Sequence, residues 1–509
     1  MIRLSQPSDI TWDTVQAVAY DQARLEIAPA LLARVDQGRR AFLHLIEQGV
    51  PCYGVTTGLG QLVTIDLSDE ERQDLPRNIL RARAAAIGPP LAKAVVRSLM
   101  MLRLVNFLSG LDGVSSELCR FLVARLNDDF TPWIPSLGHG MAADAIAHTH
   151  AFQTFIGEGF VLSPTGERLP ADQALAARGL APYPLAEKEG LALLNGLAAT
   201  PAYALDAHRL LSRLLSLANA VAAVSLEGAA APKDAVDPAL KTVSPEPGVA
   251  AIIDALQPWL KNSHIQPVKL QSPISYRIIP QVHGALLDAL TGLRQRIEAT
   301  FRTFSDNPLM VLDDSPLGGR LLSVGLFHNQ HLVNQVEQVA LSLAHVGSLS
   351  ERRLHRLLNP QNTGLTLQLA ARPGLDAGLV VAQKAGLGLE ARLKLLAQPV
   401  SLTTGESSAG QEDYMSMAFP AISRLYEMAD LVKALLAYEL LGGLVALDQR
   451  RDAPGEGVAA LHAYLRQHLP PLHRDRSPGP DVEQLLTLFE TDAFWAVLTH
   501  KLAEPSLAS

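Results

Sequence analysis

Apolar residues recur at helical spacing along most of the chain. Residues 30–49 place apolar side chains about 3.6 positions apart and stop at Gly49, which is typical of a helix that ends at a glycine. The same periodicity predicts further helices at residues 91–109, 115–127, 201–227, 285–302, 327–357, 375–397 and 412–450. The last of these is too long to be stable as an isolated surface helix, so the pattern predicts long helices packed in a bundle.

Two junctions between loop and helix stand out. Ser68 followed by Glu71 forms a capping box, which predicts a helix from there to Arg83. Residues 131–160 begin as a Pro/Gly-rich loop and become a small-residue apolar helix from about Ala142. Such a junction presents free backbone N–H groups and the positive end of a helix dipole, so it suits either an anion or a plain turn into a buried helix.

The segments between the helices are more polar. The stretch from Gly159 to about residue 185 contains prolines and predicts a short hairpin, whereas residues 228–247 and 261–283 are predicted to be irregular. The tail, residues 455–503, predicts two short helices around a Pro/Arg-rich loop at 469–480.

These elements predict a mostly α-helical fold. The regions expected in chain order are an N-terminal loop and helix region at 1–200, a central long-helix bundle at 201–450 and C-terminal short helices at 451–509. Composition agrees with a globular protein, because 48% of the 509 residues are hydrophobic and 18% are charged. A chain of this length has material for one large core or two to three domains.

The charge balance narrows the class of ligand. The net charge is -8, and no stretch clusters Lys and Arg with aromatic residues. Nucleic-acid partners and anionic membrane surfaces are therefore not expected, which leaves a small molecule as the expected ligand.

The number of cysteines and the length of the apolar segments indicate the cellular compartment. Two cysteines, Cys52 and Cys119, are too few for a disulfide framework, and the N-terminal residues lack a basic start followed by an apolar run. The longest uncharged apolar segment, around Leu214–Leu226, is shorter than the roughly 20 residues that a membrane span needs. We predict a core helix there and a cytoplasmic protein.

The common catalytic motifs are missing. The sequence contains no Walker loop, no dinucleotide fingerprint after a strand and no Gly-x-Ser-x-Gly turn. His148 and His150 are two positions apart, so on a helix they point roughly 200° apart and do not easily share a metal ion. No metal is expected. Tyr53 to Gly60, YGVTTGLG, has three glycines and predicts a loop whose backbone approaches a ligand closely.

Six segments carry a resemblance to a known family. They are YGVTTGLG at 53, KEGLALLNG at 188, YRIIPQVHG at 276, SDNPL at 305, GSLSERR at 347 and GQEDYMSMA at 410. Together, and in this order, they resemble the histidine and phenylalanine ammonia-lyase family over nearly the whole chain. The resemblance implies the long-helix bundle of the aromatic amino acid ammonia-lyases, a homotetramer with active sites shared between chains, and elimination of an amine from an α-amino acid.

The chain departs from the family at the tripeptide that becomes its electrophile. Family members carry Ala-Ser-Gly before an Asp, and these residues cyclise and dehydrate to methylidene-imidazolone. The equivalent positions here, before Asp144, are Met141, Ala142 and Ala143. No serine is present to lose water, so we expect no built-in electrophile and no other cofactor.

Other positions are changed or kept. Where histidine ammonia-lyases carry a substrate-facing His in Ser-His-Ala-Ala, this chain has Arg83, and where they carry a Tyr it has Ile274. Residues that match the family's functional motifs are Tyr53, Asn195, Gln271, Arg277, Phe327 and Glu412. The sequence thus predicts an active site in which some of the family's residues are replaced and others are retained.

The missing electrophile points to a class of substrate. Elimination needs a base for the β-proton and a nitrogen that leaves readily, and a fully alkylated nitrogen leaves as a neutral tertiary amine. A trimethylammonium betaine of an aromatic amino acid meets this condition. Within the family the pattern resembles the ergothionase branch, which implies conversion of ergothioneine to thiolurocanate and trimethylamine.

Roles follow from this hypothesis for the residues that matched. Arg277, supported by Asn195 and the neighbouring Gln271, would hold the carboxylate by charge-assisted hydrogen bonds. Tyr53 would take the β-proton, and since a phenol has a pKa of about 10 it needs a nearby cation. Lys384 is a candidate for that cation, with a surface lysine as the equal alternative.

Four further side chains have weaker assignments. Glu412 would balance the substrate cation or cap the last long helix, and Phe327 and Tyr414 would offer aromatic faces to the trimethylammonium group or belong to the core. Arg83 would pair with the sulfur-bearing imidazole or lie on a helix surface.

Other functions stay open. They are an amino-acid lyase or aminomutase with another activation, a lyase for a betaine without sulfur, a catalytically inactive binding subunit and a metal-dependent enzyme. Measuring trimethylamine and ammonia released from ergothioneine, hercynine and histidine separates these possibilities.

Overall fold

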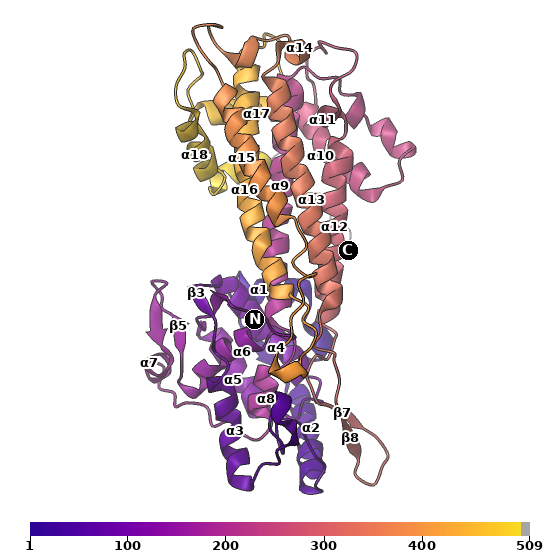
Figure 1. The fold of residues 1–509 in the computed structure, drawn as a ribbon, viewed down its shortest axis with the longest axis vertical. Coiled ribbons are helices and arrows are strands. Elements are labelled where there is room, and N and C mark those ends of the chain that lie inside the picture. Colours follow the sequence, from indigo (N-terminus) through magenta and orange to yellow (C-terminus); the bar gives the residue numbers. More distant parts are fainter. Residues whose placement is uncertain (500–509) are drawn as a thin grey trace. The chain divides into compact units, whose positions relative to one another are not determined.

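The computed structural model describes residues 1–499 as a mostly α-helical protein (Figure 1), as the sequence predicts. The chain forms two compact units. Of the described residues, unit 1 comprises 1–207, 294–336 and 400–423, and unit 2 comprises 208–293, 337–399 and 424–499. Four of the five boundaries fall inside long helices, namely α9 (Ala199–Gly228), α12 (Ile279–Thr300), α13 (Gln330–Leu357) and α16 (Ala418–Asp448), and the fifth lies in the loop before α16. The consecutive regions 1–200, 201–450 and 451–509 stay a prediction.

Unit 1 is built from short and medium helices around one apolar core. Its own helices are α1 (Trp12–Ala19), α2 (Pro29–Glu47), α3 (Asp69–Arg81), α4 (Lys93–Phe107), α5 (Ser116–Asn127), α6 (Ala145–Phe152), α7 (Ala171–Ala176) and α8 (Glu189–Leu194). A core cluster joins α2, α3, α6 and α8 to the loop before α3; it contains Phe42, Cys52, Ile79, Ala145 and Leu194. This cluster fixes the loop that carries Tyr53 against the start of α6.

Short strands form four pairs in the described part of unit 1. β1 (Ile2–Leu4) is parallel to β2 (Leu25–Ile27), whereas three pairs are antiparallel: β3 (Ile87–Pro90) with β4 (Pro135–Leu137), β5 (Phe160–Leu162) with β6 (Arg168–Pro170), and β7 (Leu309–Leu312) with β8 (Gly319–Leu322). The β5–β6 pair confirms the predicted hairpin. The other pairs have only three or four residues per strand, too few for an alternating pattern to reveal.

Unit 2 contains the parallel long helices that the periodicity predicts. Its further helices are α10 (Pro247–Leu260), α11 (Ile274–Arg277), α14 (Pro360–Thr363), α15 (Val380–Leu396), α17 (Glu456–Arg466), α18 (Pro478–Leu488) and α19 (Asp492–Thr499). Buried polar contacts tie the bundle together: Arg353 on α13 pairs with Glu439 on α16 at 2.5 Å, and Ser225 on α9 donates to the same carboxylate at 2.6 Å. Two short helices were predicted for the tail, and that prediction was wrong, because α17, α18 and α19 are three.

The start of α3 confirms a local prediction. The Ser68 hydroxyl accepts from the backbone N–H of Glu71, and the Glu71 carboxylate accepts from the N–H of Ser68 at 2.8 Å. This reciprocal capping satisfies two N–H groups that the first helical turn leaves free. The backbone hydrogen bond from Ser68 also lowers the pKa of Glu71.

The start of α16 contradicts the prediction that Glu412 begins the last long helix. Met417 has a φ of 53°, which stops a helix from extending N-terminally beyond Ala418. Glu412 lies instead in a tight turn, where Ser407 and Glu412 form an isolated β-bridge. Helix capping is therefore not the role of Glu412.

Among the described residues, one helical stretch passes a test for a membrane span by length and composition. It covers residues 189–228, and 78% of its most apolar part is buried inside the fold. A buried core helix passes the same test, so this is weak evidence for a span and agrees with the core helix that we predicted.

Candidate active site

A cleft of about 620 Å³ opens in unit 1, within the range of small-molecule sites. It is built by loops that lie far apart in the sequence. Its lining includes Tyr53, Arg83, Met141, Ala142, Ala143, Asn195, Asn307, Phe327 and Glu412. Eight of these nine were singled out from the sequence, and the fold brings them to one place.

Tyr53 enters the cleft from the glycine-rich loop after α2. Its hydroxyl oxygen accepts a hydrogen bond of 2.8 Å from the backbone N–H of Gly60, the first residue of a short 3-10 helix, Gly60–Thr64. A backbone donor at this distance stabilises negative charge on the phenol oxygen. Sequence reasoning predicted a loop with close backbone approach but did not identify Gly60 as the partner of Tyr53.

Arg83 follows the end of α3 and lies half-buried in the cleft. Its guanidinium donates to the Ile79 carbonyl at 3.3 Å. Burial lowers the pKa of Arg83, while the negative charges of Tyr53 and Glu412 oppose that shift. Arg83 is therefore a cation within electrostatic reach of both groups.

Asn195 and Asn307 form one hydrogen-bonded unit. Asn195 follows α8 and donates from Nδ2 to the Asn307 carbonyl at 2.7 Å. The side-chain oxygen of Asn307 accepts from the N–H of Val324 at 2.8 Å, which fixes the amide. We call Tyr53, Asn195 and Asn307 the polar wall of the cleft. Asn307 was missed from the sequence, although it is part of the SDNPL segment that carried the family resemblance.

Glu412 and Phe327 also line the cleft. The Glu412 carboxylate accepts from the Ser407 hydroxyl at 3.1 Å, and its carbonyl accepts from the Ser407 N–H at 2.8 Å. Phe327 lies between β8 and α13 and lines the cleft. Tyr414 does not line it: this side chain is 55% exposed, with its ring centroid 5.9 Å from that of His328.

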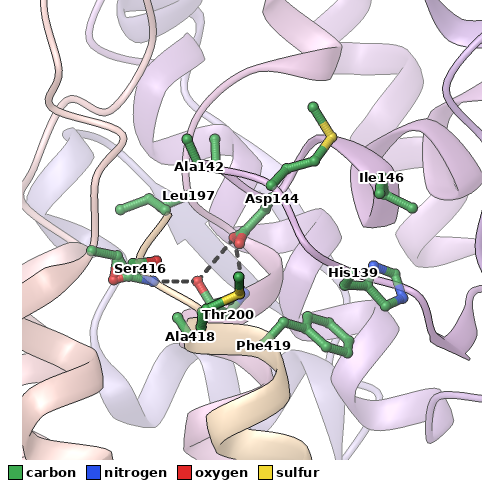
Figure 2. A pocket seen from close by; sticks show the side chains of 13 residues that line it. His139, Ala142, Asp144, Ile146, Leu197, Thr200, Ser416, Ala418 and Phe419 are labelled. Carbon is green, nitrogen blue, oxygen red and sulfur yellow. Dashed lines mark hydrogen bonds between the residues drawn. The ribbon is translucent and has the colours of Figure 1, made fainter. Parts of the chain in front are cut away.

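Residues 141–143, here called the triad loop, separate the cleft from a small cavity of about 20 Å³ (Figure 2), which has room for about one water molecule. The buried Asp144 carboxylate anchors this loop. It accepts from the N–H groups of Ala198 and Thr200 at 2.9 Å and from the Thr200 hydroxyl at 3.1 Å, so it caps α9. Burial raises the pKa of Asp144 to about 6, against the lowering effect of these hydrogen bonds.

The triad loop does not fit the family's electrophile. None of Met141, Ala142 and Ala143 has a side-chain hydroxyl, and the loop precedes α6 as a series of bends. The predicted helix start at Ala142 was three residues early, since α6 begins at Ala145. No dehydration of residue 142 can give an exocyclic methylidene.

Three predicted site residues belong to unit 2. Arg277 ends α11 and donates from Nε to the Ser272 carbonyl at 3.0 Å, Gln271 lies in the loop before it, and Lys384 lies on the exposed side of α15. None of the three is among the residues that line the cleft. Their roles stay predictions.

The histidines near the triad loop have individual partners. His139 contacts the Pro135 carbonyl at 2.7 Å, His148 the Leu194 carbonyl at 3.0 Å, and His150 accepts from the Ala86 N–H at 3.0 Å. Within residues 1–499, no group of three or more His, Cys, Asp or Glu side chains is arranged to hold a metal ion.

Comparisons of the sequence find extensive similarity. A family model described as aromatic amino acid lyase matches residues 10–467. The histidine ammonia-lyase of Stigmatella aurantiaca is 33% identical over 486 residues, which are 94% of each chain. That of Sorangium cellulosum (strain So ce56) is 36% identical over 455 residues, which are 88% of each.

Solved structures show the same fold. Ergothionase of Treponema denticola, an ergothioneine-degrading enzyme in complex with desmethyl-ergothioneine sulfonic acid, matches with a TM-score of 0.91 at 24% identity and covers 98% of this chain and 99% of its own. Histidine ammonia-lyase of Trypanosoma cruzi matches with a TM-score of 0.86 at 25% identity, covering 99% and 97%. The cleft thus occurs in a fold that this chain has in common with a histidine ammonia-lyase and an ergothionase.

Proposed function

Because the chain belongs to the aromatic amino acid lyase family, we propose that it eliminates trimethylamine from a trimethylammonium betaine of an aromatic amino acid, with ergothioneine as the favoured substrate. One observation carries this proposal: the cleft keeps the family's base and amide while the triad loop has no side chain from which an electrophile is made.

The first chemical requirement is removal of the β-proton. We assign this to the phenolate of Tyr53, whose oxygen already accepts the Gly60 N–H. Arg83, in the same chain and the same cleft, supplies the nearby cation that a phenolate needs. A similar role for Lys384 would require that residue to come from another subunit.

The second requirement is departure of the nitrogen. As Tyr53 takes the β-proton, the C–H electrons form the Cα=Cβ double bond and the Cα–N bond breaks. A trimethylammonium nitrogen leaves as neutral trimethylamine, so no electrophile has to capture it first. The products are the aryl acrylate and trimethylamine, and the proton remains on the Tyr53 oxygen.

Substrate binding uses both charges of the betaine. Glu412 and the ring of Phe327 face the cleft and would receive the trimethylammonium group, since quaternary ammonium favours aromatic faces and carboxylates. Asn195 would hold the carboxylate together with Arg277 and Gln271. Those two residues do not line the cleft of their own chain, so we propose that a neighbouring subunit contributes them.

Assembly as a homotetramer is part of the proposal. Helix α15 exposes apolar side chains, with Val381 50% and Leu395 74% exposed in the single chain, while its other side is buried. A helix that is apolar on both sides indicates a further packing partner. Lys384 lies among these exposed residues, which would place it at a subunit contact.

Similarity in fold to the ergothionase of Treponema denticola supports a trimethylammonium betaine as the substrate. Similarity in sequence to histidine ammonia-lyases supports a second candidate function. Identity of 33–36% with those enzymes favours ammonia release from histidine as the alternative. The triad loop argues against it, because an unactivated ammonium group is a poor leaving group.

One assay separates the candidates. Purified protein is incubated with ergothioneine, hercynine, histidine, phenylalanine and tyrosine, and trimethylamine, ammonia and acrylate absorbance are measured. We expect trimethylamine from ergothioneine and no ammonia. Ammonia from histidine would establish the alternative, and no product from any substrate would support an inactive relative.

A further inference from the structure

Four charged side chains are completely buried behind the polar wall. Lys188 lies 2.7 Å from an oxygen of Asp306 and 3.8 Å from an oxygen of Asp112, and Arg103 lies 3.5 Å from Asp112. All four side chains are at most 1% exposed. Such a cluster is costly to bury unless its charges and hydrogen bonds are matched closely.

The carboxylates of Asp112 and Asp306 accept fewer hydrogen bonds than two buried, ionised carboxylates require. In the part of the chain that the structure describes, Oδ1 of Asp112 and Oδ1 of Asp306 have no hydrogen-bond donor, although both are buried. Two adjacent carboxylates in a buried site cannot both stay ionised at low cost, whereas one proton between them satisfies an oxygen on each.

We propose that Asp112 and Asp306 share one proton, so that this cluster carries one net positive charge that favours anions at the polar wall. The second half of this statement rests on the proposed function. Lys188, which begins the KEGLALLNG segment, is then a positioning residue for the base and for the substrate carboxylate.

The electrostatic environment agrees with a shared proton. Burial and the neighbouring Asp306 raise the pKa of Asp112 well above its usual range. Burial also tends to raise the pKa of Asp306, but Lys188, Asp112 and Arg103 together outweigh it and the net shift is downward. Burial tends to lower the pKa of Lys188, and the two carboxylates reverse that. The proton therefore belongs mainly to Asp112.

Neighbouring groups do not cancel the charge. Burial raises the pKa of Cys52 to about 12 and lowers that of His148 to about 3, so both are neutral at pH 7. Arg72 and Glu187, which also face Cys52, pair with each other. The buried carboxylate of Glu189, which follows Lys188, lies within electrostatic reach of the Arg39 cation. Two cations and one shared negative charge leave a net charge of +1.

The cluster touches the polar wall through the backbone. Asp306 directly precedes Asn307, Cys52 directly precedes Tyr53, and Lys188 begins the segment whose helix leads to Asn195. Lys188 lies 2.7 Å from Asp306, the residue before Asn307, and its buried charge acts across protein and not across water, so it is weakly screened. It favours the Tyr53 phenolate and a bound carboxylate.

Gly196 shows how closely Arg103 is packed into this wall. The glycine has a φ of +89°, and a Cβ there would come within 2.5 Å of the Arg103 guanidinium. Only glycine combines this backbone with such an approach. The last residue of KEGLALLNG thus makes room for the second cation of the cluster.

The shared proton can be tested without any assay of activity. Infrared spectra of the protein with isotope-labelled aspartate, at about pH 8 where Asp144 is ionised, should show a protonated carboxyl band. We expect Asp112→Asn to abolish it, and Asp306→Asn as well, since the remaining Asp112 then ionises against Lys188. A wild type without the band, or variants that keep it, would overturn the proposal.

The charge itself is tested through the pH dependence of kcat/KM for trimethylamine release. Lys188→Met removes the net positive charge of the cluster. We therefore expect the acidic limb of the kcat/KM profile to shift to higher pH by about one unit. Lys188→Arg retains the charge and should leave the acidic limb where it is in wild type. Asp112→Asn should leave the acidic limb of the profile at its wild-type pH, because the net charge of the cluster stays at +1. A shift of the limb to lower pH would mean that both aspartates were ionised in wild type. A rate loss in Lys188→Met without a shift would leave Lys188 a structural role only.

These outcomes are distinct from failure of the proposed function. If wild-type protein releases no trimethylamine from any betaine, the proposed function fails while the infrared band still decides the shared proton. If trimethylamine is released and the band is missing, the proposed function stands and the cluster has another protonation state.

Discussion

The cleft has two walls that differ in what lies behind them. Behind the polar wall are buried ions, and its side chains are fixed by hydrogen bonds of 2.7–2.8 Å. The triad loop has no polar side chain of its own, is anchored by one carboxylate, and has a small cavity behind it. In the proposed function the triad loop supplies no electrophile, so the difference assigns proton removal to the polar wall.

The largest effect is expected at Tyr53. Tyr53→Phe removes the base but keeps the ring, so kcat/KM for trimethylamine release should fall by about 1,000-fold, within the usual contribution of a general base. Circular dichroism and the oligomeric state should match wild type. Retention of more than a tenth of the wild-type activity would show that Tyr53 is not the base. Proton removal would then not depend on the polar wall.

Arg83 tests whether one cation in the cleft assists the base. Arg83→Gln should lower kcat/KM by about 10- to 100-fold for ergothioneine and hercynine alike, because it acts on Tyr53, whereas Arg83→Lys should keep most of the activity. Steady-state kinetics on both substrates measure this. A loss confined to ergothioneine would show instead that Arg83 contacts the sulfur.

Asp144 gives the triad loop a pH-dependent anchor. A folded-state pKa of about 6 lies above the usual value of 3.8, so the folded state binds the proton more tightly between these values. The stabilisation from Asp144 is thus complete at about pH 4 and is lost as pH rises through 6, by on the order of 3 kcal/mol.

Thermal unfolding of Asp144→Asn and wild type between pH 4 and 8 measures this dependence. Relative to the variant, wild type should lose stability as pH rises through 6. A constant difference in Tm over this range would mean that Asp144 is ionised throughout.

The smallest effect is expected within the triad loop. Ala142→Gly should change kcat/KM by less than about threefold, since the side chain at this position has no chemical role in the proposal and surface-type changes are mild. Ala142→Val, which intrudes into the cleft, is the matched control for steric effects. A 100-fold loss of kcat/KM in Ala142→Gly would show that the triad loop takes part in catalysis, which contradicts the proposed function.

Local signals in the sequence predicted local structure well. The capping box at Ser68 and Glu71 is formed as predicted, because all its partners lie within one helical turn. The start of α16 was misplaced because Met417 adopts a left-handed backbone, which side-chain periodicity does not reveal. Pairs such as Lys188 and Asp306 are 118 residues apart, so only the fold brings them together.

The cleft itself was predicted from the family resemblance and not from periodicity. That resemblance identified Tyr53, Asn195 and Glu412, which the structure places together. It could not show that the hydroxyl of Tyr53 accepts from Gly60 or that buried ions lie behind Asn307. Arg277 and Lys384 depend on a neighbouring subunit in our proposal, and a single chain cannot display such a contact.

The composition of the triad loop also bears on how the enzyme becomes active. A protein that builds an electrophile from its own backbone must fold first and then complete a slow covalent maturation, and the finished group is open to attack by external nucleophiles. With Met141, Ala142 and Ala143 in the loop, the proposed enzyme would be competent as soon as its subunits assemble. It should also tolerate borohydride or cyanide at concentrations that inactivate electrophile-dependent relatives.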